Sequence, residues 1–396
     1  MNTRRVWMFG LVFLVLLSGS VSGCKSIPNT STSAEIKLLD DTLFPLHHAF
    51  AVESPEEIFH LEEDALLFAE HAVNQKGAFK KDIKKFVKAI FEHSDKGMRY
   101  RNSANTAANV TFNNRAANCL SLSIMTYALA EHAGLHAKFF EVDIPEYWTR
   151  REGYSLLNGH INLRVSLPSD YKSSVIGEKW ADVDFDPQTL RNLFPRVAVS
   201  KEKVIAMFYN NKGADAILAN SYTKAYSYFR AAAKIAPDLQ QSWANLGVLY
   251  RMVGAYEQAE NVYKYTLSVD DDNLTAWENL SILYRYQGKT EEAARISEMV
   301  KRKRLDNPFY HYILGEQALE QGDIEFAVEH FKAGLKLDDK NHEILFALAR
   351  AYLLQKDMIM AQSYIKKAAR HSDNEQDRLR YTAKLSSLQS NTNPHR

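Results

Sequence analysis

The sequence predicts two domains, an α+β domain followed by an all-α solenoid of helical repeats. Its 396 residues are more than a single domain usually contains. A 34-residue period runs through the C-terminal half. In the N-terminal half, segments with apolar residues at helical spacing are followed by short strand-like runs. We expect the α+β domain over residues 35–205, five repeats over 206–376, and a capping helix with a polar tail over 377–396.

The N-terminal residues have the pattern of an export signal. Arg4 and Arg5 precede an apolar run over residues 6–17, which is short for a membrane span and typical of a signal peptide. The motif Val21-Ser22-Gly23-Cys24 follows and resembles the lipobox of bacterial lipoproteins.

This resemblance implies that residues 1–23 are a cleaved lipoprotein signal peptide and that Cys24 carries the lipid. Residues 24–34 then form a flexible tether, because they are mostly Ser, Thr and Asn. We therefore expect a protein of the bacterial cell envelope, lipid-anchored to a membrane. Lys25 after the lipidated residue favours the outer membrane, with the protein facing the periplasm.

The overall charge gives no sign of nucleic acid binding. Lys plus Arg number 49 and Asp plus Glu number 48, so the chain has no strong basic field. A protein or peptide partner is expected instead, and no motif calls for a cofactor.

The 34-residue period is the strongest pattern in the chain. One alanine recurs at this interval, at Ala225, Ala259, Ala293, Ala327 and Ala361. Small residues recur at a second phase, at Gly213, Gly247, Ser281, Gly315 and Ala349. This is the pattern of tetratricopeptide (TPR) repeats, in which each repeat is a pair of amphipathic helices and the small residue lets the two helices approach.

Stacked helix pairs would form a continuous core and a concave groove, because no single pair can bury its apolar face. We expect the first helix of each pair to line this groove and to contact the partner through Asn210, Asn245, Asn279 and Tyr312. The basic run over residues 301–304 is interpreted as a solvated helix end, which is the ordinary role of such runs.

Before residue 206 the pattern indicates helices and then strands. Apolar spacing predicts helices between residues 35 and 99, and another helix over 119–133 that Gly134 closes. Runs rich in aromatic and β-branched residues predict three strands, over 137–142, 161–167 and 179–185.

Cys119 is the candidate nucleophile. Only two cysteines are present, so Cys119 lacks an intramolecular disulfide partner if Cys24 carries lipid. At a helix start the amide N–H groups and the helix dipole favour the thiolate, and the N–H of Cys119 is the candidate oxyanion donor. A small buried side chain with no chemical role is the alternative.

A base and an orienting acid follow in the chain. His160 is expected to open the strand over 161–167, where its ring could reach the start of the cysteine helix. On the next strand, alternation places Asp182, Asp184 and Asp186 on one face.

The run Asn118-Cys119-Leu120-Ser121 and the later Ala133-Gly134-Leu135 resemble the core helix and following strand of the transglutaminase-like superfamily. The order Cys, His, Asp matches as well. The resemblance covers residues 38–195 and is strongest to bacterial members that carry TPR repeats. It implies a papain-like α+β fold and acyl transfer or hydrolysis through a thioester.

The resemblance also implies which acid completes the triad. Asp184 lies four residues after Trp180, the offset found in the family, so the implied catalytic residues are Cys119, His160 and Asp184. Asp186 is the alternative, since it precedes a proline as family members often do. Many members have Gly where this chain has Ala117, and a methyl group there could narrow access to the thiol.

Metal sites are the other interpretation of these residues. The histidines show no ligand spacing with cysteines, which argues against zinc. Asp182, Asp184 and Asp186 could offer oxygen ligands, but the Gly and closing Glu of a calcium loop are absent. We expect no metal.

Two functions from different classes follow. The first is a membrane-anchored, cysteine-dependent acyltransferase or amidohydrolase that acts on protein or peptide amides in the periplasm, with the repeats recruiting substrate. The second is a noncatalytic TPR scaffold or assembly lipoprotein of the cell envelope. The residues do not decide between hydrolysis and transfer.

Overall fold

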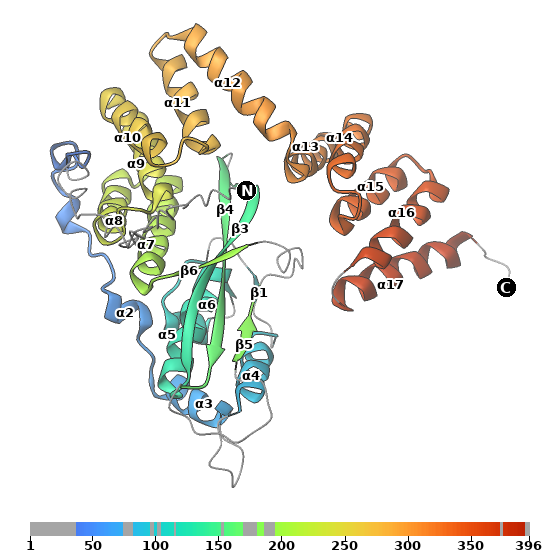
Figure 1. Cartoon of the computed structure of the whole chain (residues 1–396), viewed down its shortest axis with the longest axis horizontal. Coiled ribbons are helices and arrows are strands. Elements are labelled where there is room, and N and C mark those ends of the chain that lie inside the picture. The colour runs from blue at the N-terminus through green and yellow to red at the C-terminus, as the bar shows by residue number, and fades with distance from the viewer. Residues whose placement is uncertain are drawn as a thin grey trace, which may run out of the picture.

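A computed structural model describes residues 37–73, 82–95, 99–100, 104–114, 116–151, 154–168, 180–185, 195–372 and 375–392. In these ranges an α+β domain is followed by a curved array of paired helices (Figure 1). The signal peptide, Cys24, the tether and Asp186 lie outside the described residues, so those expectations stay predictions. None of the helices in the described ranges is both long and apolar enough to cross a membrane.

The α+β domain is built from short helices around one antiparallel sheet. The sheet has the order β5-β4-β3-β6, and a parallel β1-β2 pair lies apart from it. Its helices are α2 (Pro55–Phe59), α3 (Glu63–Val73), α4 (Ile83–Asp95), α5 (Ala108–Asn113) and α6 (Cys119–His132). Its strands are β1 (Arg99–Tyr100), β2 (Ala116–Ala117), β3 (His136–Arg151), β4 (Tyr154–Ser166), β5 (Trp180–Val183) and β6 (Arg196–Val199).

The three predicted strands exist, with different limits. β3 and β4 extend well beyond the predicted runs as one long hairpin, interrupted by an irregularity in register after Val142. His160 therefore does not open its strand as expected, but lies within β4 opposite Val142. β6 was not predicted, because its four residues carry too short a pattern.

Strand alternation divides the sheet into two faces. Ile161, Leu163 and Val165 of β4 are buried in one cluster with the apolar residues of α6. His160, Asn162 and Arg164 lie on the other face of the same strand. Helix α6, which begins at Cys119, thus covers the apolar face, and the polar face of β4 carries His160.

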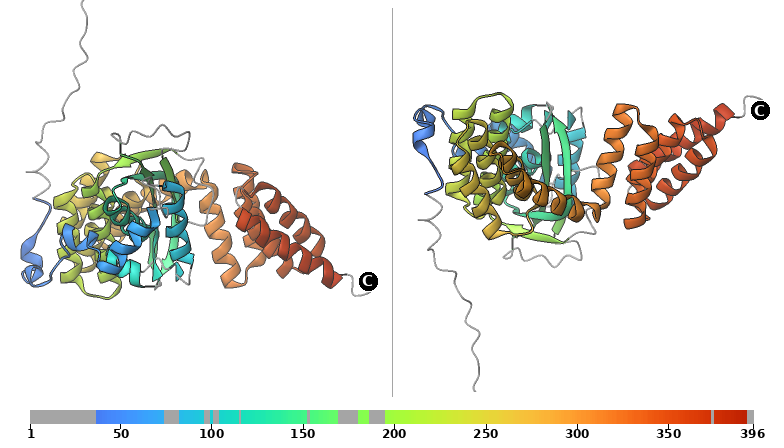
Figure 2. Two further views of the ribbon diagram at one scale, coloured as in Figure 1. Left: turned by 90° about the horizontal axis from the view of Figure 1, so that it is seen from below. Right: turned by 90° about the horizontal axis from the view of Figure 1, so that it is seen from above.

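The C-terminal half forms helix pairs with the predicted period, and the TPR-like solenoid is therefore present. The pairs are α7 (Lys201–Leu218) with α8 (Tyr222–Ile235), α9 (Gln240–Met252) with α10 (Tyr256–Val269), α11 (Leu274–Tyr286) with α12 (Thr290–Leu305), α13 (Pro308–Gln321) with α14 (Ile324–Leu337), and α15 (His342–Leu354) with α16 (Met358–His371). Helix α17 (Glu375–Thr392) packs on α16 and covers the last pair, as predicted for a capping helix (Figure 2).

The turn inside each pair repeats one backbone conformation. The residue there has a positive φ in all five pairs, namely Asn220, Gly254, Gly288, Gly322 and Lys356, each 34 residues after the last. Glycine occupies three of these positions because it adopts the left-handed region without strain. The period seen in the sequence is therefore a period of backbone geometry.

Close helix approach explains the small residues. A Cβ atom built on Gly213, Gly247 or Gly315 would lie 2.4–2.5 Å from a ring carbon of the paired helix, at Phe229, Tyr263 and Phe331 respectively. Each ring therefore packs directly on the backbone of the first helix. This confirms the predicted role of the small residues at these three positions.

The segment over residues 37–53, here called the strap, packs on the first two repeats. Within it lie two short 3₁₀ helices, η1 (Asp41–Leu43) and η2 (His47–Ala49). The Phe44 ring stacks on Tyr226 with ring centroids 4.5 Å apart, and the Tyr250 hydroxyl donates to the Leu38 carbonyl. The sequence grouped the strap with the α+β domain, but its side chains lie against the repeats.

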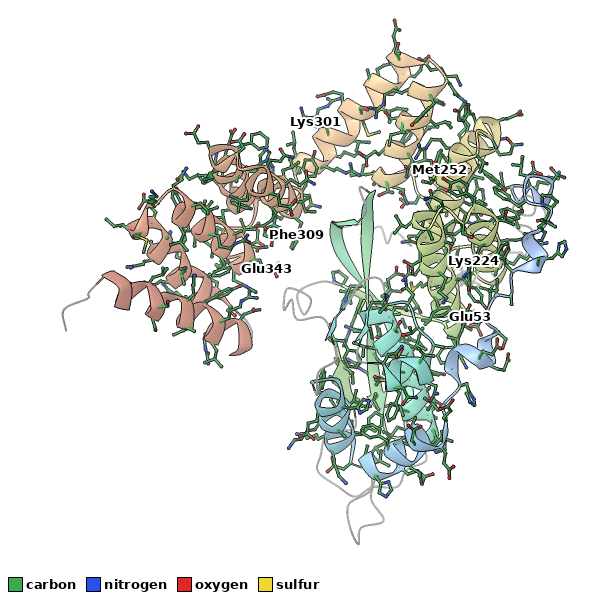
Figure 3. The ribbon with its side chains drawn as sticks, turned by 180° about the vertical axis from the view of Figure 1, so that it is seen from behind. Glu53, Lys224, Met252, Lys301, Phe309 and Glu343 are labelled. Atoms are coloured by element: carbon green, nitrogen blue, oxygen red, sulfur yellow. The ribbon has the colours of Figure 1, made fainter. Side chains whose placement is uncertain are left out.

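The strap also carries charged contacts to the repeats. Arg230 pairs with Asp41 through two hydrogen bonds. At the end of the strap, the Tyr228 hydroxyl donates to the Glu53 carboxylate at 2.7 Å, and Lys212 lies 2.9 Å from the same side chain. Figure 3 shows Glu53 beside α7 and α8. The strap thus holds the first repeat at several points.

A partly buried carboxylate joins the second and third repeats. Glu260 on α10 accepts hydrogen bonds from Gln287 and Lys289 at the end of α11 and pairs with Lys264. Burial favours the neutral acid, but these hydrogen bonds outweigh it and lower the pKa of Glu260 to about 2. The carboxylate is therefore more stable ionised in the folded chain than in the unfolded one.

Glu260→Gln is expected to destabilise this junction by about 1 kcal/mol at pH 7, a modest value because both lysines are partly exposed. Since the folded pKa lies below the ordinary value, the contribution is present above about pH 4.5 and disappears as the pH falls toward 2. Urea unfolding of both proteins at pH 7 and pH 3 measures it. An equal gap at both pH values would contradict this account.

Candidate functional site

Cys119 is the first residue of α6, as the sequence predicted. The Asn118 side chain caps the helix by accepting a hydrogen bond from the Ser121 N–H at 2.8 Å. Cys119 is partly buried against the core of the α+β domain. Cys119 therefore lies at the end of α6 that carries the unpaired first-turn amides and the positive end of the dipole.

His160 and Asp184 are joined by a hydrogen bond. Nε2 of His160 lies 2.8 Å from Oδ2 of Asp184, and the imidazole side chain is 2% exposed while the carboxylate is 30% exposed. A carboxylate can only accept, so Nε2 carries the proton of this bond. This bond fixes the tautomer and leaves Nδ1 as the ring nitrogen that would exchange a proton with a nucleophile.

The structure distinguishes the candidate acids by their neighbours. Asp182 accepts two hydrogen bonds from Arg164 and pairs with Arg196 at 2.9 Å. Partial burial opposes its ionisation, but the two arginines hold the pKa of Asp182 below its ordinary value. Asp182 therefore forms ion pairs with two arginines, and Asp184 is the acid that is hydrogen-bonded to the imidazole.

Two residues of this site, Asn162 and Arg164, were not predicted from the sequence. Asn162 lies on β4 with its Nδ2 3.5 Å from the Asp184 carboxylate. Arg164 stacks over Trp180, with its guanidinium 3.9 Å from the ring centroid, so this tryptophan packs on the ion pair. The alternation of residues along β4 was the available signal for both, because they share a face with His160.

No metal centre is visible among the described residues: no group of three or more His, Cys, Asp and Glu side chains lies close enough to hold an ion. Asp182, one candidate ligand of the calcium interpretation, is paired with arginines instead.

A second candidate site lies at the far end of the array, between α15 and α17. Here a groove of about 720 Å³ is lined by apolar and basic side chains. The apolar lining includes Phe346, Leu353 and Leu354, and the basic lining, here called the rim, consists of Arg350, Arg380 and Lys384. Leu354 is 56% exposed, so its side chain is accessible to a partner.

Ion pairs only partly neutralise this rim. Arg350 pairs with Glu316 at 3.1 Å, and Arg380 pairs with Asp377 at 2.9 Å and lies over the Phe346 ring. Three cations against two anions leave the groove, here called the α15–α17 groove, with a positive balance.

The other predicted contact residues have mixed environments. Asn245 donates to Asn210 at 2.9 Å, so these asparagines join the first helices of the first two repeats. Asn279 and Tyr312 are partly buried on α11 and α13.

The basic run over residues 301–304 forms ion pairs. Arg304 is buried and pairs with Glu278 at 2.8 Å, and Lys303 pairs with Asp272. Lys301, Arg302 and Lys303 are exposed, as expected of a solvated helix end, but Arg304 is buried against Glu278, so that interpretation is wrong for the last residue of the run.

No family model matches this sequence, and no curated protein matches it. Among solved structures, MamA from Desulfovibrio magneticus RS-1 is 17% identical, with 43% of this chain and 97% of that chain covered and a TM-score of 0.24. YrrB, described as a TPR protein with an unusual peptide-binding site, is 15% identical, with 46% and 94% covered and a TM-score of 0.24.

PilF of Pseudomonas aeruginosa is 17% identical, with 49% of this chain and 88% of that chain covered and a TM-score of 0.26. At these TM-scores the similarities carry no argument about this chain. The repeat architecture rests instead on its own helix pairs and its 34-residue backbone period.

Proposed function

We propose that this protein is a binding scaffold whose repeat array holds a protein partner. The observation that carries this proposal is the α15–α17 groove, which combines the exposed Leu354 and the partly buried Phe346 and Leu353 with a positive rim. An amphipathic segment with acidic residues satisfies both features, because its apolar side chains would cover Leu354 while its carboxylates meet Arg350 and Lys384.

Lys384→Glu is expected to weaken binding of an acidic amphipathic peptide about tenfold, because it removes an attraction and adds a repulsion. The measurement is fluorescence anisotropy with a labelled peptide of alternating Glu and Leu residues at 50 and 300 mM salt. Affinity should fall at the higher salt, since rim charges are screened.

Lys366→Glu is the matched control, because Lys366 is an exposed lysine on α16 outside the groove. A peptide with Gln in place of Glu should bind weakly to both proteins. Equal affinity for the Glu and Gln peptides, or equal effects of the two lysine variants, would show that this groove is not the binding site of the acidic peptide.

A second function, cysteine-dependent acyl transfer or amide hydrolysis, is favoured by one specific observation. This is the hydrogen bond between Asp184, which directly follows β5, and His160 of β4, the strand that packs against the helix beginning with Cys119. We propose that the thiol loses its proton to Nδ1 of His160 and attacks a carbonyl carbon. The imidazolium would then protonate the leaving amine, and water or a second amine would release the acyl group from the thioester.

Cys119 is expected to react with iodoacetamide at pH 6 at least tenfold faster than a thiol of ordinary pKa, about 8.5. The first-turn amides and the imidazole both favour the thiolate, so His160→Ala should slow the reaction. Mass spectrometry of the Cys119 peptide over time measures the rate. Ordinary reactivity at pH 6, or none before unfolding, would leave the scaffold as the sole function.

A further inference from the structure

A chain of buried hydrogen bonds connects the first repeat helix to the residue before Cys119. Asp215 on α7 accepts a hydrogen bond from Nδ2 of Asn105 at 2.5 Å. Oδ1 of Asn105 in turn accepts one from Nδ2 of Asn118 at 2.5 Å. Oδ1 of Asn118 then accepts the Ser121 N–H of the first turn of α6.

The two ends of this chain fix the direction of every bond. The Ser121 N–H can only donate and the Asp215 carboxylate can only accept, so each amide between them has one possible orientation. Asn105 is 8% exposed and Asn118 is 5% exposed, so water competes little for these bonds. The Asn118 side chain is therefore held at both of its polar atoms.

The backbone around Asn105 is held to the same helical turn. The Ser121 hydroxyl donates to the Ala104 carbonyl at 3.0 Å and accepts the Thr106 N–H at 2.9 Å. The segment over residues 104–106 thus bridges α7 and the start of α6. Any displacement of α7 near Asp215 would be passed to Asn118 through this segment.

Helix α7 also shares a core with the α+β domain. Val204, Ile205 and Phe208 of α7 are buried in the same cluster as the apolar residues of α6 and β4. The first repeat and the cysteine helix therefore pack as one unit, and the polar chain runs along this packed contact.

We propose that Asp215 is a positioning residue for Cys119, which acts through Asn105 and Asn118 and ties the geometry of the thiol to the repeat array. This inference rests on the second function proposed above. Asn118 directly precedes the nucleophile, so its orientation sets the direction of the Cys119 N–H and of the first-turn amides. Partner binding that moves α7 would change the reactivity of the thiol.

The test compares three full-length variants. Asp215→Leu removes the terminal acceptor at similar size, and Asp215→Asn keeps an amide oxygen that can accept from Asn105. Lys212→Met is the control on the same helix, because Lys212 pairs with Glu53 of the strap and takes no part in the chain. Two readouts are taken: the pH profile of Cys119 alkylation, and hydrogen exchange of the peptide that holds residues 118–121.

Asp215→Leu should shift the alkylation profile to higher pH, slow alkylation at pH 6 about tenfold, and raise exchange at the start of α6 about tenfold. Asp215→Asn should restore both readouts nearly to those of the unmodified protein. Lys212→Met should lower the melting temperature without shifting the profile. A folded Asp215→Leu variant with unchanged exchange and an unchanged profile would overturn the inference.

The two readouts also separate this inference from the function on which it rests. If the unmodified protein alkylates like an ordinary thiol, the acyl-transfer function fails. In that case faster exchange in Asp215→Leu would still support the hydrogen-bond chain, and unchanged exchange would refute it.

Discussion

Asp184→Asn is expected to lower the rate of Cys119-dependent acylation by about 10⁴-fold, while the fold is retained. The size follows the serine protease example, in which loss of the orienting carboxylate leaves the imidazole in the wrong tautomer. Here the bond at stake is the 2.8 Å contact between Nε2 of His160 and Asp184. Single-turnover acylation with an activated amide measures the rate.

Asp182→Asn is the matched control for this prediction, because Asp182 lies on the same face but pairs with Arg164 and Arg196. It should change the acylation rate less than tenfold and mainly affect stability. Asp186→Asn belongs in the series, since Asp186 was the alternative acid. If Asp186→Asn proves the severe variant, the acid is misassigned; if all three variants are mild, no triad operates.

Phe44→Ala is expected to have the largest effect on stability, about 3–5 kcal/mol for the strap and the first two repeats. The ring is 3% exposed and stacks on Tyr226 and Tyr250, so its loss leaves a cavity between the strap and two repeats. Hydrogen exchange of α8 and α9 localises the change, which a single global melting curve would not do.

Leu46→Ala is the control within the same segment. Leu46 is 65% exposed, so its truncation should change stability by no more than about 0.5 kcal/mol. Similar exchange in the two variants would show that the strap does not stabilise the repeats.

The repeats were predictable because their signal is local and periodic. A 34-residue interval in alanines and small residues corresponds to a repeated turn with positive φ and a repeated ring-on-glycine contact. The strap was not predictable, because its partners lie far away in sequence: Asp40 and Tyr250 meet across 210 residues. No local pattern in residues 37–53 points to such a contact.

The candidate site shows the same division. Alternation along the predicted strand placed the acids on one face. The family resemblance, not the alternation, implied that His160 and Asp184 lie on adjacent strands. The arginines that hold Asp182, and the Asp215 carboxylate behind Asn118, come from elements that only the tertiary fold brings near. Position along a strand could therefore be read from the sequence, but the choice among partners could not.

Photocrosslinking tests the scaffold proposal most directly. A photoreactive phenylalanine analogue is placed at Leu354 in the α15–α17 groove or at Ile359, an exposed apolar residue of α16 outside it. In purified full-length protein with the acidic amphipathic peptide, crosslinking is expected from position 354 and not from 359, and Lys384→Glu should lower it about tenfold at a peptide concentration below the dissociation constant. Equal crosslinking from both positions, or none from position 354, would contradict the proposal that this groove binds the partner.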